Sequence, residues 1–208
     1  MNLLVSAIMP TRGRPDLARE AKRMFDEQTY PNKELVIVDD LMEPSFPYGV
    51  VPGAVYSKAP RVSIGEKRNL CVAKANGQII IHWDDDDRYS PDRMAHQVEM
   101  LTTGVAAIVG YHEMEFERED GARFLYRGSP GKPCGTSFCY WKRTWEVCKF
   151  EHIDNGEDGA FLRTIRQEKG LYSAQTTQAQ GRIVARIHNG NTASKLVEGN
   201  PIQWKRVA

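Results

Sequence analysis

The sequence predicts an α/β fold: a single domain with a mostly parallel central sheet and a smaller mixed C-terminal part. Its first half alternates short apolar strands with amphipathic helices, as in a doubly wound parallel sheet. Two of these strands end in carboxylates, at Asp39-Asp40 and at Asp84–Asp87. Because the carboxyl ends of parallel strands lie at one sheet edge, where such folds bind ligands, these acids also predict the location of a site.

The chain opens with an expected strand and helix. Leu3–Met9 is apolar but short and has no basic segment before it, so it predicts a first strand rather than a signal peptide. Pro15–Gln28 has apolar residues at helical spacing and a proline in its first turn. The next expected elements are the strand Glu34–Val38, a short strand Ala54–Ser57, the helix Gly65–Asn76, the strand Gln78–Trp83 and the helix Pro91–Leu101.

The second half mixes strands, a hairpin and helices, which predicts the smaller mixed part of the domain. Asp120-Gly121 is a good hairpin turn. The expected elements are the strand Val105–Tyr111, the hairpin strands Glu113–Glu119 and Ala122–Arg127, the strand Thr136–Tyr140, the helices Trp141–Val147 and Glu157–Glu168, and the strand Ile183–Ile187. Residues 1–103 and 104–192 should be two halves of one domain, and residues 193–208 a peripheral tail.

Composition excludes several classes of protein. The 208 residues are 41% hydrophobic and 26% charged, as in an ordinary globular domain. The formal net charge is +1, so no global basic field attracts nucleic acid or anionic lipid. No apolar run approaches the roughly 20 residues that span a bilayer, so we expect a cytoplasmic protein without a transmembrane segment. Cys71, Cys134, Cys139 and Cys148 form no CxxC pair, which favours reduced, packed thiols over a zinc site.

The acidic run Asp84–Asp87 is the most informative feature of the chain. It follows the apolar stretch Gln78–Ile81, and four adjacent charges cannot remain inside a sheet, so they should lie where the strand meets solvent. Clustered carboxylates there can hold Mg²⁺ or Mn²⁺, which can neutralise a diphosphate. A solvated acidic turn before the helix after Pro91 is the plainer interpretation, but the position after a buried strand favours a site. His82 and Trp83 should pack rather than react.

Two further pairs of charged residues belong to the same predicted edge. Asp39 and Asp40 can accept hydrogen bonds from a base or a ribose, although a turn or a helix cap explains them about equally well. Lys67 and Arg68 lie near the start of the next helix and can reach a phosphate. Either one alone is more often a solvated surface charge.

Together these segments resemble the family-two glycosyltransferases, which have the GT-A fold, a Rossmann-like nucleotide-sugar fold. The resemblance covers nearly the whole chain, in the family's order. Any one of these segments is weak evidence for the family, but their occurrence together in the family's order is specific evidence for it. The matching segments are Val5–Pro15, Gln28–Asp40, Gly65–Asn69, Ala75–Pro91, Gly135–Trp145, Gly156–Asp158 and His188–Thr192.

The resemblance implies a role for each matching residue. Asp86, as an acid of the family's DxD element, and the late His188 would bind Mn²⁺ or Mg²⁺. Asp158 would be the catalytic base, although taken by itself the Glu157-Asp158 pair is better explained as acids in the first turn of a helix, which interact well with its dipole. The nucleotide would contact Pro10, Thr11, Arg12, Asp39, Asp40, Arg68, Asp84 and Asp85. Residues 1–103 would then be the nucleotide-binding half, and residues 104–192 the acceptor and catalytic half.

The implied activity is an inverting, metal-dependent transfer of a sugar from a nucleotide-diphosphate donor, with a UDP-sugar favoured, to an acceptor hydroxyl. The alternative is a non-catalytic nucleotide- or carbohydrate-binding module of the same fold. The acceptor stays open between a glycan, a lipid-linked sugar, a protein, a small molecule and a modified nucleic-acid base. The chain departs from common members at Gly13-Arg14 and after Asp40, where Leu41 replaces the usual Gly-Ser continuation.

Overall fold

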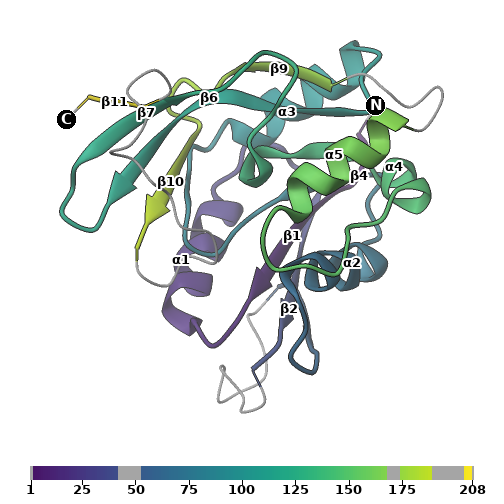
Figure 1. The fold of residues 1–208 in the computed structure, drawn as a ribbon. Coiled ribbons are helices and arrows are strands. Elements are labelled where there is room, and N and C mark those ends of the chain that lie inside the picture. Colours follow the sequence, from purple (N-terminus) through teal and green to yellow (C-terminus); the bar gives the residue numbers. More distant parts are fainter. Residues whose placement is uncertain (1, 42–52, 168–173, 189–203, 208) are drawn as a thin grey trace.

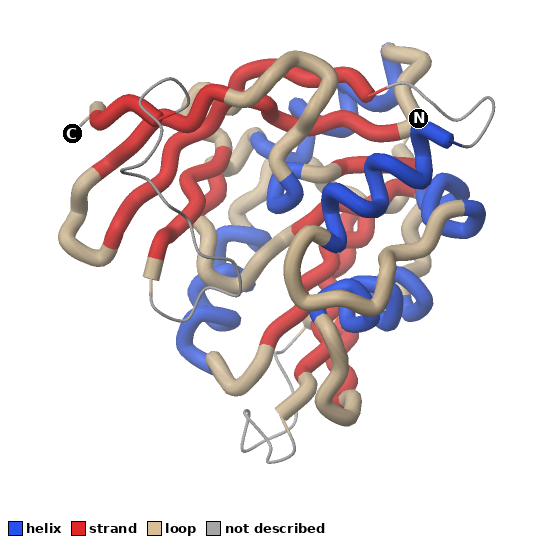
Figure 2. Tube along the Cα trace, viewed as in Figure 1, coloured by secondary structure: helices blue, strands red, loops and turns tan. Residues whose placement is uncertain are grey.

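A computed structural model describes residues 2–41, 53–167, 174–188 and 204–207. They form a mixed sheet with helices on both faces (Figure 1; Figure 2). The elements, in chain order, are β1 (Val5–Thr11), α1 (Pro15–Asp26), β2 (Lys33–Asp39), β3 (Val55–Lys58), α2 (Ile64–Lys74), β4 (Ile79–His82), β5 (Arg88–Tyr89), α3 (Arg93–Thr103), β6 (Ile108–Arg118), β7 (Arg123–Arg127), the 3-10 helix η1 (Gly135–Ser137), β8 (Cys139–Trp141), α4 (Lys142–Val147), α5 (Glu157–Gln167), β9 (Ala174–Gln178), β10 (Ile183–Ile187) and β11 (Trp204–Arg206).

The sheet has a parallel half and a mixed half. Across the described residues the strand order is β11-β7-β6-β8-β4-β1-β2-β3. Strands β4, β1, β2 and β3 are parallel to one another, and every residue of β1 and β4 is buried. β8 pairs antiparallel with both β4 and β6, and so joins the two halves. The predicted α/β fold with a mostly parallel central sheet is confirmed.

Alternation along β1 separates two hydrophobic layers. Val5, Ala7 and Met9 face one layer, with α1 and α3, and Ile8 faces the other, with α2, α4 and α5. Because both faces are covered, the central strands are apolar throughout, as parallel strands usually are. The polar ends of these strands are therefore confined to the sheet edges, and this arrangement places the acidic run at the carboxyl edge.

The structure differs from the expected elements mainly in the mixed half. The two strands expected over 105–119 are one long strand, β6, whose pairing with β9 shifts register between Tyr111 and Glu113. Strands β5 and β9 were not expected, because Arg88–Tyr89 is too short for a pattern and Ala174–Gln178 has no apolar alternation. The helices and the parallel strands lie within about two or three residues of their expected positions.

The segment expected to be a peripheral tail contributes a strand. Trp204–Arg206 forms β11, which pairs antiparallel with β7 at the outer edge of the sheet. The Trp204 ring packs against Phe116 and Tyr126, with ring centroids 4.9 Å from each. These three residues are therefore integrated into the sheet rather than peripheral, and the assignment of residues 1–103 and 104–192 to separate functions stays a prediction.

A buried arginine, Arg93, joins the end of β4 to η1. The Arg93 guanidinium donates to the carbonyls of His82, at 2.8 Å, and Thr136, at 3.0 Å. It also lies over the rings of Trp83 and Tyr89, at 5.2 and 4.5 Å. Because these contacts come from β4, β5 and η1, Arg93 holds the end of β4 in a defined position relative to the mixed half.

On the face of the sheet covered by α2, α4 and α5, Asn69 likewise joins separate elements. Its amide donates to the Phe150 carbonyl at 2.9 Å and accepts from the Trp145 indole at 2.8 Å and the Phe150 amide at 3.0 Å. All three bonds are buried, so α2 is tied to the segment that leads into α5. The position of α5 over the carboxyl edge depends on this tie.

We predict that Asn69→Ala lowers the free energy of unfolding by about 3 kcal/mol, because it leaves buried partners of Asn69 without hydrogen bonds. Urea denaturation followed by circular dichroism measures the change. Lys74→Ala, an exposed change on the same helix, is the control and should stay within about 0.5 kcal/mol of wild type. Equal stability of the two variants would show that the Asn69 contacts are not structural.

Candidate active site

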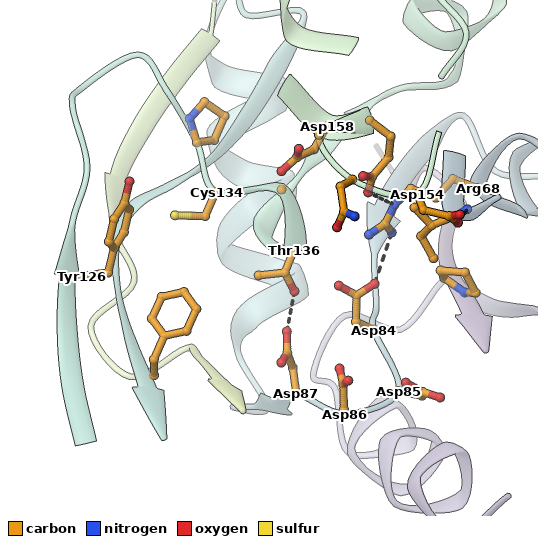
Figure 3. Close-up of a pocket in the computed structure, with 18 of the residues that line it drawn as sticks. Arg68, Asp84, Asp85, Asp86, Asp87, Tyr126, Cys134, Thr136, Asp154 and Asp158 are labelled. Atoms are coloured by element: carbon orange, nitrogen blue, oxygen red, sulfur yellow. Dashed lines mark hydrogen bonds and ion pairs between the residues drawn. The ribbon is translucent and has the colours of Figure 1, made fainter. Parts of the chain in front are cut away.

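The carboxyl edge of the sheet opens into a cavity of about 470 Å³ between the parallel and mixed halves (Figure 3). Its floor is the acidic run, one side is the start of α5, and another is the loop before η1. The residues that line it are Pro10, Arg14, Ile64, Arg68, Asp84, Asp85, Asp86, Asp87, Phe116, Tyr126, Lys132, Pro133, Cys134, Gly135, Thr136, Asp154, Asn155, Gly156, Glu157, Asp158 and Trp204.

Arg68 links the two halves of this cavity. Its guanidinium lies 3.1 Å from the Asp84 carboxylate and 3.3 Å from that of Glu157. Burial by itself would raise the pKa of Asp84, but the charge of Arg68, together with smaller contributions from His82 and from hydrogen bonds to Arg68 and Thr136, outweighs it and lowers that pKa to about 2. Burial raises the pKa of Glu157, with Asp158 adding to the effect and Arg68 opposing it. Asp84 is therefore ionised at any physiological pH and can accept hydrogen bonds from a ligand.

Arg14 is the counter-ion of the next two acids. Its guanidinium lies 2.9 Å from both Asp85 and Asp86, and the Thr11 hydroxyl donates to Asp85 at 2.5 Å. Burial nevertheless raises the pKa of Asp85 to about 7, because the favourable charge of Arg14 is partly offset by the neighbouring Asp86. The acidic run is therefore not fully neutralised by the protein itself.

The two residues expected to bind a metal lie together. His188 Nε2 is 3.0 Å from Asp86 Oδ2, although the two residues are 102 positions apart. Imidazole nitrogen and carboxylate oxygen are both suitable ligands for Mn²⁺. Within the described ranges, no group of three or more His, Cys, Asp or Glu side chains is arranged to hold a metal. Two protein ligands fit a cation whose other ligands come from substrate phosphates and water.

Asp87 has a structural role. It accepts a hydrogen bond of 2.5 Å from the Thr136 hydroxyl and one of 3.1 Å from the Arg186 amide. The Arg186 guanidinium also donates to the Asp86 carbonyl at 2.5 Å and contacts Glu20 at 3.0 Å. These contacts attach η1, β10 and α1 to the same acidic turn.

A second cavity, of about 660 Å³, lies beside the first and is lined by most of the other predicted nucleotide contacts, whereas Asp39 lines neither of the two cavities. Pro10 and Arg14 line both cavities, whereas Thr11, the exposed Arg12 and Asp40 line the second alone. The two cavities form neighbouring compartments along the sheet edge.

Asp39 and Asp40, at the end of β2, differ in their contacts: Asp39 accepts several internal hydrogen bonds, whereas Asp40 pairs with a lysine and lines the second cavity. Asp39 accepts from the amides of Gly13 at 3.3 Å and Leu41 at 3.0 Å, and from the Tyr56 hydroxyl at 3.1 Å. Burial, together with the Asp39 charge, raises the pKa of Tyr56 to about 12. Asp40 lies 2.6 Å from the buried ammonium of Lys67. Lys67 is therefore an internal counter-ion, and Asp40 is the acid that faces the second cavity.

Asp158 lies in the first turn of α5 and faces the loop before η1 (Figure 3). Its carboxylate accepts from the Gly159 amide at 2.7 Å. A Cβ at Gly135 would collide with this carboxylate, so the absence of a side chain there lets the loop approach it. Glu157 pairs with Arg68, whereas Asp158 projects into the cavity near Thr136.

The residues expected to be inert are packed. His82 and Trp83 are fully buried, and His82 Nδ1 lies 2.8 Å from the Gly135 carbonyl. Burial lowers the pKa of His82 well below its usual value, with the charge of Arg68 adding to the effect. The four cysteines are free thiols, and of these Cys134 alone is only half-buried. The expected packing of His82 and Trp83 is confirmed, and Cys71, Cys139 and Cys148 are buried as well.

Sequence reasoning missed several residues of the cavity. Arg14, which was not expected, pairs with Asp85 and Asp86, whereas the expected Arg12 lines the second cavity; the left-handed backbone of Gly13, with φ of 62°, turns the chain between them. A signal for Arg14 exists, because four adjacent carboxylates require a nearby cation. The aromatic residues Phe116, Tyr126 and Trp204 gave no such signal, because their strands meet only in the folded chain.

These features define a class of protein. Residues 52–174 match Glycosyl transferase family 2, and the match covers more than half of the chain. The chain therefore belongs to glycosyl transferase family 2, which confirms the family resemblance seen in the sequence.

A curated relative points the same way. Over 119 residues the chain is 32% identical to the putative colanic acid biosynthesis glycosyl transferase WcaA of Escherichia coli K12, across 49% of this chain and 40% of that protein. The chain thus spans less than half the length of this relative. Among the described residues, none of the helices is long and apolar enough to cross a membrane.

Solved structures confirm the GT-A fold. Staphylococcus aureus TarS 1-349, in complex with UDP-GlcNAc, aligns with a TM-score of 0.70 at 15% identity, covering 94% of this chain and 62% of that one. The mannosyltransferase PcManGT from Pyrobaculum calidifontis, in complex with GDP-Man and Mn²⁺, aligns with a TM-score of 0.67 at 18% identity, covering 90% and 58%. At these identities the likeness shows the fold.

We predict that His82 makes stability fall in mild acid. The unfolded chain binds a proton on this imidazole near pH 6.5, whereas the folded chain does not, so stability is lost as pH falls below that value. Between pH 7.5 and pH 5.5 this should remove about 1.4 kcal/mol in total, because the full slope is reached only well below pH 6.5. Because other groups titrate in both proteins, the difference between wild type and His82→Phe isolates the effect. Urea denaturation at pH 7.5, 6.5 and 5.5 measures it, and parallel curves would contradict the assignment.

Proposed function

We propose that the chain catalyses metal-dependent, inverting transfer of a sugar from a nucleotide-diphosphate donor to an acceptor hydroxyl. The observation that carries this proposal is the joint lining of one cavity by Asp84 with Arg68, by Asp86 and by Asp158. His188 lies against Asp86 at the edge of this group. Groups that could stabilise the charge of a leaving diphosphate and a group that could accept a proton therefore line the same cavity.

The two cavities suggest how a donor lies. The nucleoside would occupy the second cavity, near Asp40 and Arg12, and the diphosphate would extend past Arg14 into the first. Asp84, held ionised by Arg68, would accept from the ribose. Donor complexes of two structural neighbours, with UDP-GlcNAc and with GDP-Man, support a nucleotide sugar. The preference for a UDP-sugar and the cytoplasmic location remain our predictions.

Asp86 and His188 would hold the cation. When bound there, Mn²⁺ or Mg²⁺ would neutralise the negative charge that develops on the departing diphosphate. The contact between Arg14 and Asp86 means that this guanidinium must share or release the carboxylate when a cation binds. A released Arg14 would remain beside the diphosphate, where its charge is also favourable.

Asp158 would take the acceptor proton. The acceptor oxygen forms a bond to the anomeric carbon as the bond from that carbon to the diphosphate oxygen breaks, and the proton moves to the Asp158 carboxylate. The leaving nucleoside diphosphate retains the bonding electron pair. Attack from the face opposite the leaving group inverts the anomeric centre. A single carboxylate opposite the diphosphate suffices for this reaction.

We predict that Asp86→Asn weakens metal-dependent nucleotide binding, because it removes a charged ligand oxygen while keeping the shape of the side chain. His188→Ala should have a smaller effect in the same direction. Thermal melts with UDP, GDP, CDP or TDP, each with and without Mn²⁺, measure the shift that a ligand of the native state produces.

The control for this measurement is Asp92→Asn, an acid outside the cavity that pairs with Arg182. It should keep the wild-type shift. Absence of a Mn²⁺-dependent shift for wild type with all four nucleotides would count against the proposed donor.

We predict that Asp158→Asn lowers transfer by a factor on the order of 10² to 10⁴, the usual range for a general base, while nucleotide and Mn²⁺ affinity stay near wild type. Donor turnover and melting temperature are measured on the same preparation. Glu157→Gln is the matched control, because it removes the adjacent carboxylate and should lower turnover far less.

Two outcomes of this experiment would alter the proposal. Wild-type transfer by Asp158→Asn would remove the residue from the mechanism. Metal-dependent nucleotide binding by wild type without any donor turnover would instead support the non-catalytic binding module.

A further inference from the structure

One wall of the main cavity has no role in the proposed donor site. Phe116 on β6, Tyr126 on β7 and Trp204 on β11 line it, and we name these three rings the aromatic wall. The Trp204 ring is tilted by 68° to Phe116 and by 53° to Tyr126. Phe116 is buried, whereas Tyr126 and Trp204 are half-buried. Three separate strands therefore present ring surface to the same space as the acidic run.

The position of this wall separates it from the donor. Figure 3 shows Tyr126 on the opposite side of the cavity from Arg68, with Thr136 and Asp158 between them. The proposed base must contact the acceptor hydroxyl rather than the nucleotide. The side of the cavity beyond Asp158 is therefore the side on which an acceptor has to lie.

We propose that the aromatic wall is the acceptor subsite and that the acceptor is a saccharide; this inference rests on the proposed function. A pyranose ring has an apolar face of C–H groups, which packs on the π-face of an aromatic side chain. Its hydroxyls project from the ring edge, where Thr136, Lys132 and the carboxylates of the cavity can bind them. The wall and its surroundings match this amphipathic chemistry.

The charge of the cavity argues against a polyanionic acceptor. Of the residues that the structure describes, seven carboxylates line it against three cations, Arg14, Arg68 and Lys132; the carboxylates are Asp84, Asp85, Asp86, Asp87, Asp154, Glu157 and Asp158. A nucleic acid or a multiply phosphorylated acceptor would be repelled by this excess. A neutral saccharide instead offers hydroxyl donors to the carboxylates.

The shape and polarity of the wall argue against two neutral alternatives. The rings meet at steep angles, so they form a corner rather than a flat slot for a nucleobase. A lipid chain laid along the wall would desolvate the neighbouring carboxylates without supplying hydrogen bonds. A saccharide meets both the ring surface and the polar rim.

Tryptophan fluorescence tests the proposal directly. The protein, saturated with UDP and Mn²⁺, is titrated with chitotriose, maltotriose, cellotriose and mannotriose, and separately with adenosine and dodecyl phosphate. At least one trisaccharide should produce a saturable change in emission, because it covers the half-buried Trp204. Trp204→Leu, which keeps apolar volume beside Phe116, should abolish most of that change. It should also raise the KM for that saccharide by about tenfold, as expected for loss of one aromatic contact.

Two further variants provide a second test of the aromatic wall and a control. Tyr126→Leu should raise the KM for the saccharide in the same way, with a smaller effect on the KM for the donor. Trp141→Leu replaces another half-buried tryptophan, on β8 and outside the cavity lining, and should leave the Trp204 response unchanged. Melting temperatures confirm that each variant is folded.

The outcomes distinguish failure of the saccharide subsite from failure of the proposed glycosyl transfer. Failure of wild type to bind any of UDP, GDP, CDP and TDP with Mn²⁺ would overturn the proposed function itself, and if another of the four binds in place of UDP, the titration uses that nucleotide. Normal UDP binding with no response to any of the four trisaccharides, or a response only to adenosine or dodecyl phosphate, would overturn the saccharide subsite alone. A saccharide KM that is unchanged in both Trp204→Leu and Tyr126→Leu would do the same.

Discussion

The concentration of negative charge at one sheet edge is the constraint on which the rest of this structure depends. The acids Asp84–Asp87 take their partners from several separate parts of the chain. Arg68 comes from α2, Arg14 from the loop before α1, Thr136 from η1 and the Arg186 amide from β10. Because buried like charges repel strongly without partners, the elements that supply them must converge on this turn. The same contacts that allow the turn to exist also bring the cavity walls together.

The negative charge at this edge is only partly neutralised by the protein's own cations, and the remaining charge favours binding of a positively charged ligand. Arg68 keeps Asp84 fully ionised, whereas Asp85 remains close to protonation near neutral pH despite its contact with Arg14. Burial therefore exceeds what the available cations offset. An arrangement of this kind is unfavourable for folding but favourable for a ligand that brings positive charge. Strain of this sort is typical of functional sites, where local stability is exchanged for binding.

The sequence predicted what depends on local pattern and missed what depends on distant contact. Strands β1, β2 and β4 were predictable because buried parallel strands are continuously apolar, and their acidic ends placed the site. Strand β9 was not predictable, because its polar sequence carries no alternation and it forms by pairing with β6. Asp86 and His188 were expected to act together only through the family resemblance; no spacing rule joins residues 102 positions apart.

The cavity belongs to two parts of the sheet, and this division constrains how specificity can vary. The parallel half, with Arg14, Arg68 and the acidic run, provides the charges that a nucleotide diphosphate requires. The mixed half provides Asp158 and the rings of β6, β7 and β11. Because β8 is the strand that joins the halves in the sheet order, side chains on β7 or β11 can change without moving the end of β4. Asp158, held beside the side-chain-free Gly135, lies at the boundary, where as the proposed base it would determine which acceptor hydroxyl can react.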